Sequence, residues 1–211
     1  MEEGIVIQLQ AEAINESVDI ETLLRKAYLV ARKLQLTEFE KWISCEQNGY
    51  KDNIPDYRII GGEIKAWNPY HGWIPVVFDG KTSDIFNKMP VALPIAAISD
   101  VYNDSNGNVG FTVPGEIAEI LNKSNGFMPT KYSFQASKSE LRKIISAVRN
   151  RILDWSILLE ENGIVGEGLR FTDDELRTAH ESHVINNYTN NFYSNADNTQ
   201  IQQGGDGNQQ Q

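Results

Sequence analysis

The sequence predicts an α+β fold, in which a helical hairpin and one long helix pack on a small, mainly antiparallel sheet. Three observations lead to this prediction. Residues 17–50 carry two consecutive amphipathic helix patterns, residues 57–135 carry short apolar runs separated by turn residues, and residues 137–162 repeat apolar side chains at helical spacing. We expect this α+β domain over residues 1–164, a linker and short helix over 165–182, and a low-complexity tail over 183–211.

The expected helical hairpin has start and stop signals for both of its helices. Asp19 can cap the first helix, and Thr37 with Glu40 has the spacing of a capping box for the second. Asn48 followed by Gly49 predicts where the second helix ends. The apolar face of the hairpin comprises Leu23, Leu24, Ala27, Tyr28, Ala31, Leu34, Phe39, Trp42 and Ile43.

Short strands are expected between the hairpin and the long helix. Residues 57–60 and 63–67 alternate like strands, and Gly61–Gly62 between them predicts a two-residue turn. The turn signal at 103–108 predicts a second hairpin, between residues 91–101 and a strand at 109–113. The other expected elements are a helix at 4–14, for which a strand is the alternative, a strand at 73–78, a short helix from Pro114 to Leu121 and a strand at 131–135.

The long helix begins at a second capping box, formed by Ser137 and Glu140, and is expected to end near Asn162 with Gly163 as its stop. Residues 163–170 contain three glycines and predict a flexible linker. A third capping box, Thr172 with Glu175, starts a short helix that ends near Ser182. The buried stripe of the long helix comprises Leu141, Ile144, Ile145, Val148, Ile152, Trp155 and Leu159.

Several blocks of the sequence together carry a family resemblance. LLRKAYLVARKL at 23–34 is followed by FEKWI at 39–43, NGY at 48–50, PDYRI at 55–59 and NPYHGWIP at 68–75. This series resembles the AbiTii domain family of abortive-infection phage defence, and the similarity extends to about Ile164. The resemblance implies a role in defence against phage and brings no catalytic residues with it. Cys45–Glu46–Gln47 departs from the charged and aliphatic residues expected at those positions.

Composition restricts the classes of function. The net charge is −10, and an acidic chain is a poor general binder of nucleic acid because phosphate binding depends on clustered Lys and Arg. The single cysteine, Cys45, has no disulfide partner and is expected to be a small packing residue. The chain has neither a signal peptide nor an apolar run of membrane length, which predicts a cytoplasmic protein without membrane contact. No motif for a cofactor or a metal is present, and none is expected.

The candidate binding loop consists of Asn68, Tyr70, His71 and Trp73. His71 titrates in the range of a general base, and the aromatic rings could stack on a nucleobase. No motif supplies His71 with a catalytic partner, so the alternative is a structural corner that covers the end of the core.

The tail is rich in amide side chains: thirteen of the 29 residues from 183 to 211 are Asn or Gln, and none is Lys or Arg. Such a segment cannot bury enough apolar surface to fold alone. We identify a candidate self-assembly pattern, in which identical segments would stack in register, while the alternative is a solvating tail without structure. The residues of this pattern are Val184, Tyr188, Phe192, Gln200, Ile201 and Gln202.

The function expected from the sequence is that of a cytoplasmic anti-phage protein. It would act through homo-oligomerisation by its tail and through contact with a phage protein or a companion defence protein. One alternative is a toxin enzyme, a nuclease or nucleotide-acting protein that uses His71. Another is a nucleic-acid sensor that uses the basic residues near the starts of the helices.

Overall fold

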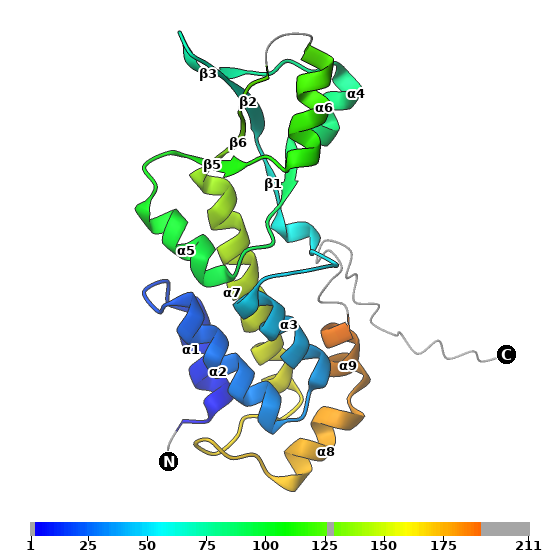
Figure 1. Ribbon diagram of the computed structural model, residues 1–211. Helices are drawn as coiled ribbons and strands as arrows, with labels where there is room; N and C mark the ends of the chain where they lie inside the picture. The colour runs from blue at the N-terminus through cyan, green and yellow to red at the C-terminus, as the bar shows by residue number, and fades with distance from the viewer. Residues whose placement is uncertain (1–2, 126–128, 191–211) are drawn as a thin grey trace, which may run out of the picture.

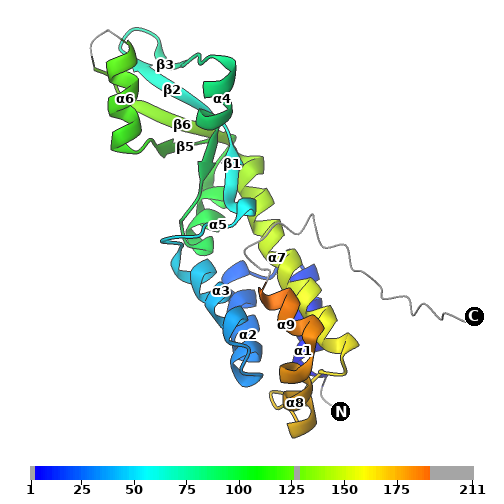
Figure 2. The same cartoon turned by 90° about the vertical axis from the view of Figure 1, so that its right-hand side faces the viewer.

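The computed structural model describes residues 3–125 and 129–190. It has two lobes joined by one long helix, α7 (Lys138–Glu161), which extends from the sheet into the helical lobe (Figures 1 and 2). This arrangement confirms the expected α+β fold, with a long helix packed on a small antiparallel sheet. The helical lobe contains α1 (Ile5–Ile14), α2 (Ile20–Lys33), α3 (Thr37–Asn48), α8 (Asp173–Glu181) and α9 (His183–Asn190), and α5 (Ile95–Asp104) lies beside the middle of the molecule.

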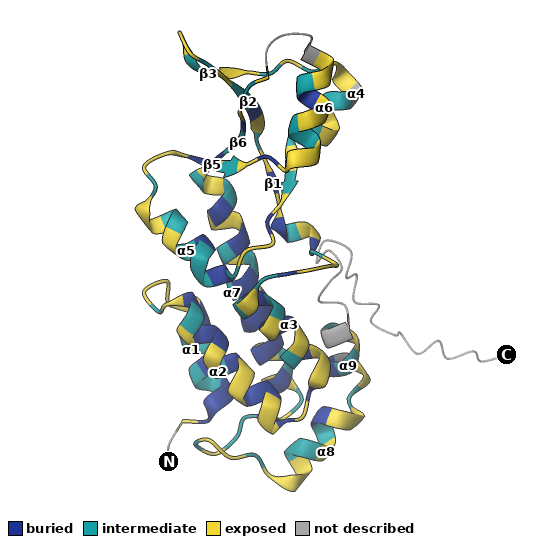
Figure 3. Ribbon diagram, in the orientation of Figure 1, coloured by how far each residue is buried: buried dark blue, intermediate teal, exposed yellow. Residues whose placement is uncertain are grey.

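The core follows the apolar stripes that the sequence predicts. Dark blue, buried segments run along α1, α2, α3 and α7 in Figure 3, whereas much of the sheet lobe is exposed. Phe39 stacks on Trp155 with ring centroids 3.8 Å apart, which joins α3 to α7. Trp42 is fully buried. Tyr28, which the stripe also includes, is 39% exposed, because it lies at the edge of the apolar face of α2.

The caps of the hairpin helices are partly as expected. The Asp19 carboxylate accepts a hydrogen bond from the backbone N–H of Thr22, as a cap should. The capping box at Thr37 is wrong, because Thr37 is already helical and Leu36 occupies the cap position. Glu40 instead forms an ion pair with Arg32 of the preceding helix at 3.0 Å. Gly49 ends α3 with a φ of 86°, as predicted.

Two sheets replace the expected pair of hairpins. The larger has the order β3-β2-β6-β5, and all of its pairs are antiparallel. Helices α4 (Gly80–Phe86) and α6 (Gly115–Asn125) lie over one of its faces (Figures 1 and 2). The strands are β2 (Glu63–Asn68), β3 (Gly72–Pro75), β5 (Asn108–Thr112) and β6 (Tyr132–Ser137) in this sheet, and β1 (Ile59–Gly61) and β4 (Lys88–Pro90) in the smaller one.

Gly61–Gly62 is not the turn of a hairpin. β1 pairs with β4 and β2 pairs with β3 and β6, so the glycines carry the chain from one sheet into the other. Gly62 is required there, since a Cβ atom on it would lie 2.6 Å from the Phe134 ring. The second expected hairpin is also wrong: residues 95–104 form helix α5, which begins after Pro94, and β5 pairs with the distant β6.

The end of the folded part is more tightly held than the sequence suggests. The expected flexible linker is fixed, because the Glu175 carboxylate accepts hydrogen bonds from the backbone N–H groups of Val165 and Gly166. The capping box of Thr172 and Glu175 is confirmed. At α7 only half of a box forms: Ser137 accepts from Ser139, while Glu140 accepts from the backbone of Gly61.

The first residues of the expected tail, 183–190, are helical. These residues form α9, so Val184 and Tyr188 lie on a helix, and the self-assembly pattern that includes them stays a prediction. Ile185 is fully buried, and the Tyr188 hydroxyl donates to the Arg151 carbonyl at 3.4 Å. Burial of Ile185 stabilises a helix that the Asn-rich composition alone would not. Phe192, Gln200, Ile201 and Gln202 lie outside the described residues.

Candidate functional site

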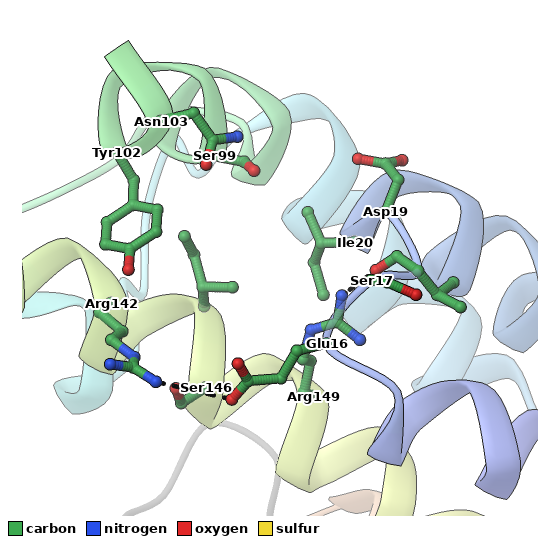
Figure 4. A pocket seen from close by; sticks show the side chains of 12 residues that line it. Glu16, Ser17, Asp19, Ile20, Ser99, Tyr102, Asn103, Arg142, Ser146 and Arg149 are labelled. Carbon is green, nitrogen blue, oxygen red and sulfur yellow. Dashed lines mark hydrogen bonds and ion pairs between the residues drawn. The ribbon is translucent and has the colours of Figure 1, made fainter. Parts of the chain in front are cut away.

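A pocket of about 320 Å³ lies where three segments meet: the connection between α1 and α2, helix α5, and the first half of α7 (Figure 4). Each helix contributes polar residues at spacings of three and four, which place them on one helical face. The α7 face carries Arg142, Ser146 and Arg149, and the α5 face carries Ser99, Tyr102 and Asn103. Ile20 and Ile145 supply apolar surface between these polar walls.

Arg149 holds the end of α1. Its guanidinium donates to the backbone carbonyls of Glu12 at 3.4 Å and Asn15 at 3.3 Å, and also to that of Val18. These bonds satisfy carbonyl oxygens that the end of a helix leaves without partners. Burial lowers the pKa of Arg149, and Glu16 and Asp19 partly oppose this shift. Its hydrogen bonds go to backbone carbonyls, so Glu16 and Asp19 act on its charge without a hydrogen bond to it in the described part of the chain.

Arg142 lies across the pocket from Glu16, and the two side chains point toward each other in Figure 4. Their charged atoms are 3.6 Å apart, with side chains 61% and 84% exposed. An exposed pair of this length stabilises a protein little, because water screens it and the side chains lose entropy on pairing. Glu16 can therefore leave Arg142 at small cost.

The candidate binding loop lies at the free end of the sheet lobe, far from this pocket (Figure 1). It is the turn of the β2–β3 hairpin. The Asn68 side chain accepts from the backbone N–H groups of Tyr70 and His71 and so fixes the turn. Tyr70 is 90% exposed, and Trp73 packs edge-on against Trp67 with centroids 5.4 Å apart.

The structural-corner interpretation fits part of this loop and the enzyme interpretation gains no support from it. Asn68 and the Trp67–Trp73 pair have structural roles, whereas Tyr70 and His71 project from the surface. Within the described residues, no hydrogen bond links the His71 imidazole to an acid or a nucleophile. No group of three or more His, Cys, Asp or Glu residues that could hold a metal ion occurs in residues 3–125 and 129–190.

A buried polar network at the junction of the lobes was not predicted from the sequence. Glu46 and Arg58 are both fully buried and form an ion pair at 2.5 Å. The Glu46 carboxylate also accepts from the hydroxyls of Tyr50 at 2.6 Å and Tyr57 at 2.5 Å, and Trp42 donates to Tyr57. Arg58 further donates to the carbonyls of Val91 and Leu93, which fixes the chain that leads into α5.

Charge and burial act together in this network. Burial and the neighbouring Glu46 raise the pKa values of Tyr50 and Tyr57, so both hydroxyls remain protonated donors. Burial alone would lower the pKa of Arg58, but the charge and hydrogen bonds of Glu46, together with Tyr50 and Tyr57, outweigh it and raise that pKa. The Arg151 guanidinium lies 3.8 Å from the Tyr57 ring centroid, so the network reaches α7.

Three of the basic residues on the helical hairpin, where the nucleic-acid sensor alternative would bind, have acidic partners. Arg25 pairs with Glu21, Lys26 with Glu12 and Arg32 with Glu40. On α7, Lys143 pairs with Glu140, and Arg151 is buried. These contacts favour a solvated helix surface over a nucleic-acid interface at the hairpin.

One match to a known family assigns this chain to a family. The AbiTii family model matches residues 4–184. The chain belongs to the AbiTii family. No curated protein and no solved structure is significantly similar to it.

The AbiTii match includes both lobes, the pocket, the hairpin loop and the buried network, and it ends within α9. Membership supports a role in abortive-infection defence against phage, as the resemblance implied. Among the residues that the structure describes, every helix is too short or too polar to span a bilayer.

The sequence blocks that carry the AbiTii resemblance meet in space. Trp42, Tyr50, Tyr57 and Arg58 come from three of those blocks, and all of them surround Glu46. Glu46 itself lies in the segment that departs from the expected residues. The sequence did offer a signal for this network, since Glu46 lies on the apolar face predicted for α3. A buried carboxylate needs a cationic partner, so such an acid predicts a buried ion pair.

Proposed function

We propose that this AbiTii protein acts in the cytoplasm as an anti-phage protein that works through self-association and protein contact. The proposal rests on one observation, the composition of the chain after the fold. Ten of the 21 residues from 191 to 211 are Asn or Gln, and none is basic. Stacked copies of such a segment can form amide ladders, with Ile201 and Phe192 in an apolar stripe.

The position of α9 supports this proposal. Because Ile185 and Tyr188 pack on the core, the tail leaves the protein from a defined place at the side of the helical lobe. The folded domains would then be carried at a distance from the stacked segments that is set by the chain after Asn190.

The exposed hairpin offers a surface for protein contact. Tyr70 and Val77 are 90% and 92% exposed, and Trp73 and Ile74 lie between them in sequence. Apolar side chains grouped on a surface are typical of protein-binding sites. We propose that a protein with an apolar surface, from the phage or from a companion defence system, docks here.

The test compares full-length protein with a chain truncated after Asn190, and Ile201→Asp with Ile201→Val. We expect light scattering to give an oligomer for full-length and Ile201→Val, and a smaller species for the truncation and for Ile201→Asp. A charge stacked on itself in every copy cannot be paired, so the aspartate should prevent assembly. Full-length protein and Ile201→Val should also protect cells from phage, whereas the truncated chain and Ile201→Asp should not.

Equal masses for the full-length and truncated chains would refute assembly through the tail. If a variant that no longer assembles still protected cells, assembly through the tail would not be needed for defence, and protection would depend on the folded domain alone. Tyr70→Ala tests the hairpin separately, since this exposed residue can be removed without a cavity; unchanged protection would exclude the loop as the contact.

A further inference from the structure

We propose that the pocket between α5, α7 and the α1–α2 connection binds a small molecule through a phosphate monoester group. This inference is independent of assembly through the tail. It starts from the size of the pocket: about 320 Å³ lies at the lower end of the range for small-molecule sites, roughly 300–1,000 Å³.

The lining suits a phosphate because its donors come from several directions. Arg142 and Ser146 approach from α7, and Tyr102 approaches from α5 with its hydroxyl toward Arg142 (Figure 4). A carboxylate is satisfied by one guanidinium, whereas a phosphate has three terminal oxygens that accept strong hydrogen bonds. Three separate donors can therefore serve one phosphate better than one carboxylate.

The charges of the lining determine what must move. The pocket holds two arginines and two carboxylates, so it is formally neutral. Asp19 is occupied as the cap of α2, where it accepts from Thr22. Arg149 is held by backbone carbonyls, and Glu16 and Asp19 partly offset its charge. This leaves the Arg142–Glu16 pair as the adjustable part.

Glu16 acts as a stand-in for the ligand in this arrangement. Its carboxylate occupies the position beside Arg142 at 3.6 Å and is 84% exposed, so an incoming phosphate can displace it into water. The phosphate would gain two charge-assisted hydrogen bonds from the fork of Arg142, which the long contact with Glu16 does not supply. The positive charge of Arg149 would attract the phosphate without a direct hydrogen bond, because three of the five donors of Arg149 already bind carbonyls.

The rest of the ligand would lie on the apolar surface between the polar walls. Ile20 is buried and Ile145 is half-buried there, while Ser99 and Asn103 offer hydrogen bonds at the α5 side. This combination suits a flat, partly polar body such as a nucleobase or a sugar, so a nucleoside monophosphate is the probe of matching chemistry.

The test measures binding of adenosine 5′-monophosphate, inorganic phosphate, adenosine and acetate to the full-length protein by calorimetry. Two variants should change the affinity for phosphate in opposite directions. Arg142→Gln removes the fork and should weaken binding of both phosphate probes by about tenfold or more. Glu16→Gln removes the competing charge and should tighten binding of both. Arg149 is unsuitable for the test because it holds the end of α1.

Arg177→Gln is the matched control, since Arg177 is an exposed arginine paired with Asp174 on α8, away from the pocket. Arg177→Gln should leave binding of both phosphate probes unchanged. If it weakened binding as much as Arg142→Gln does, the loss would come from the lower net charge rather than from the pocket, and the proposal would be overturned. Binding of adenosine or acetate as tight as that of the monophosphate would overturn the phosphate assignment. Absence of binding by both phosphate probes at millimolar concentration would overturn the site.

Discussion

At the scale of single residues, the most unusual group in this protein is the buried ion pair of Glu46 and Arg58. Both side chains are inaccessible to water, and each is surrounded by further hydrogen bonds from Tyr50, Tyr57 and backbone carbonyls. A buried pair contributes little net stability, because desolvation of the two charges offsets their attraction. Its value lies in fixing α3, the chain before β1 and the chain before α5 in one arrangement.

Loss of one partner should therefore cost far more than loss of both. We expect Arg58→Met to destabilise the fold by about 3–5 kcal/mol, since it leaves the Glu46 charge buried without compensation. Addition of Glu46→Leu should recover a large part of this loss. Denaturant melts of the two single variants and the double variant measure the coupling, and strictly additive losses would contradict it.

Trp42 and Trp67 provide a second comparison at the residue scale. Trp42 is fully buried and donates to the Tyr57 hydroxyl, whereas Trp67 is 45% exposed on the hairpin. Trp42→Ala should cost about 3–5 kcal/mol because it creates a cavity in the core. Trp67→Ala should cost clearly less. If denaturant melts gave similar losses for both, the face of α3 that carries Trp42 would not be core.

At the scale of elements, one carboxylate provides several of the hydrogen bonds that hold the segment between α7 and α8. Glu175 accepts from the backbone of Val165, Gly166 and Thr172 and from the Thr172 hydroxyl. Burial alone would raise the pKa of Glu175, but these backbone donors outweigh it and lower the pKa. Together with the backbone hydrogen bonds from Val6 to Val165 and between Glu167 and Arg170, this carboxylate holds a segment of linker composition in a defined conformation.

This shift predicts a dependence of stability on pH. A carboxyl group whose pKa is lower in the folded than in the unfolded state adds stability above its unfolded pKa of about 4.3, and this stability is lost as the pH falls through the folded value. Glu175→Gln should therefore destabilise the protein at pH 7 and bring the variant closer to wild type at acid pH. Thermal melts across pH 3–7 test this, with the exposed Glu161→Gln as control. A constant difference between wild type and Glu175→Gln at all pH values would contradict the assignment.

The helices and strands differ in how far the sequence predicts them. Helices with long apolar stripes, such as α2 and α7, were predictable because periodicity reports burial directly. The strand pairing was not, since Gly61–Gly62 has the composition of a hairpin turn but sits where the Phe134 ring excludes any side chain. Helix α4 was missed because residues 80–86 carry no buried stripe and depend on contacts such as the stacked Phe78–Phe86 pair.

The candidate site was less accessible to sequence analysis than the fold. Asn68, Tyr70, His71 and Trp73 are adjacent in sequence and were found as a group. The pocket residues come from three separate segments, 16–20, 99–103 and 142–149, so nothing local links Glu16 to Tyr102 or Arg142. The basic start of α7 was visible, but only the fold separates Arg142, which faces a pocket, from Arg151, which is buried against Tyr57.

At the scale of the whole molecule, α7 and α9 determine how the parts depend on one another. α7 contacts α1 and α2 at one end and β1 and β6 at the other, so both lobes share its buried stripe. α9 packs on α3 and α7 and closes the same core from outside. Residues 183–190 therefore belong to the folded unit.

Two truncations test this assignment. A chain that ends at Asn190 retains every buried contact of α9 and should unfold at the same denaturant concentration as the full-length protein. A chain that ends at Ser182 loses Ile185, which is fully buried, and Tyr188, which contacts the Arg151 carbonyl. Removal of a buried aliphatic side chain alone costs about 2–5 kcal/mol, so the shorter chain should be destabilised by at least that range. Ile185→Ala in the full-length chain should reproduce most of the loss. Equal stability of the two truncated chains would mean that α9 is an appendage and that the core closes without it.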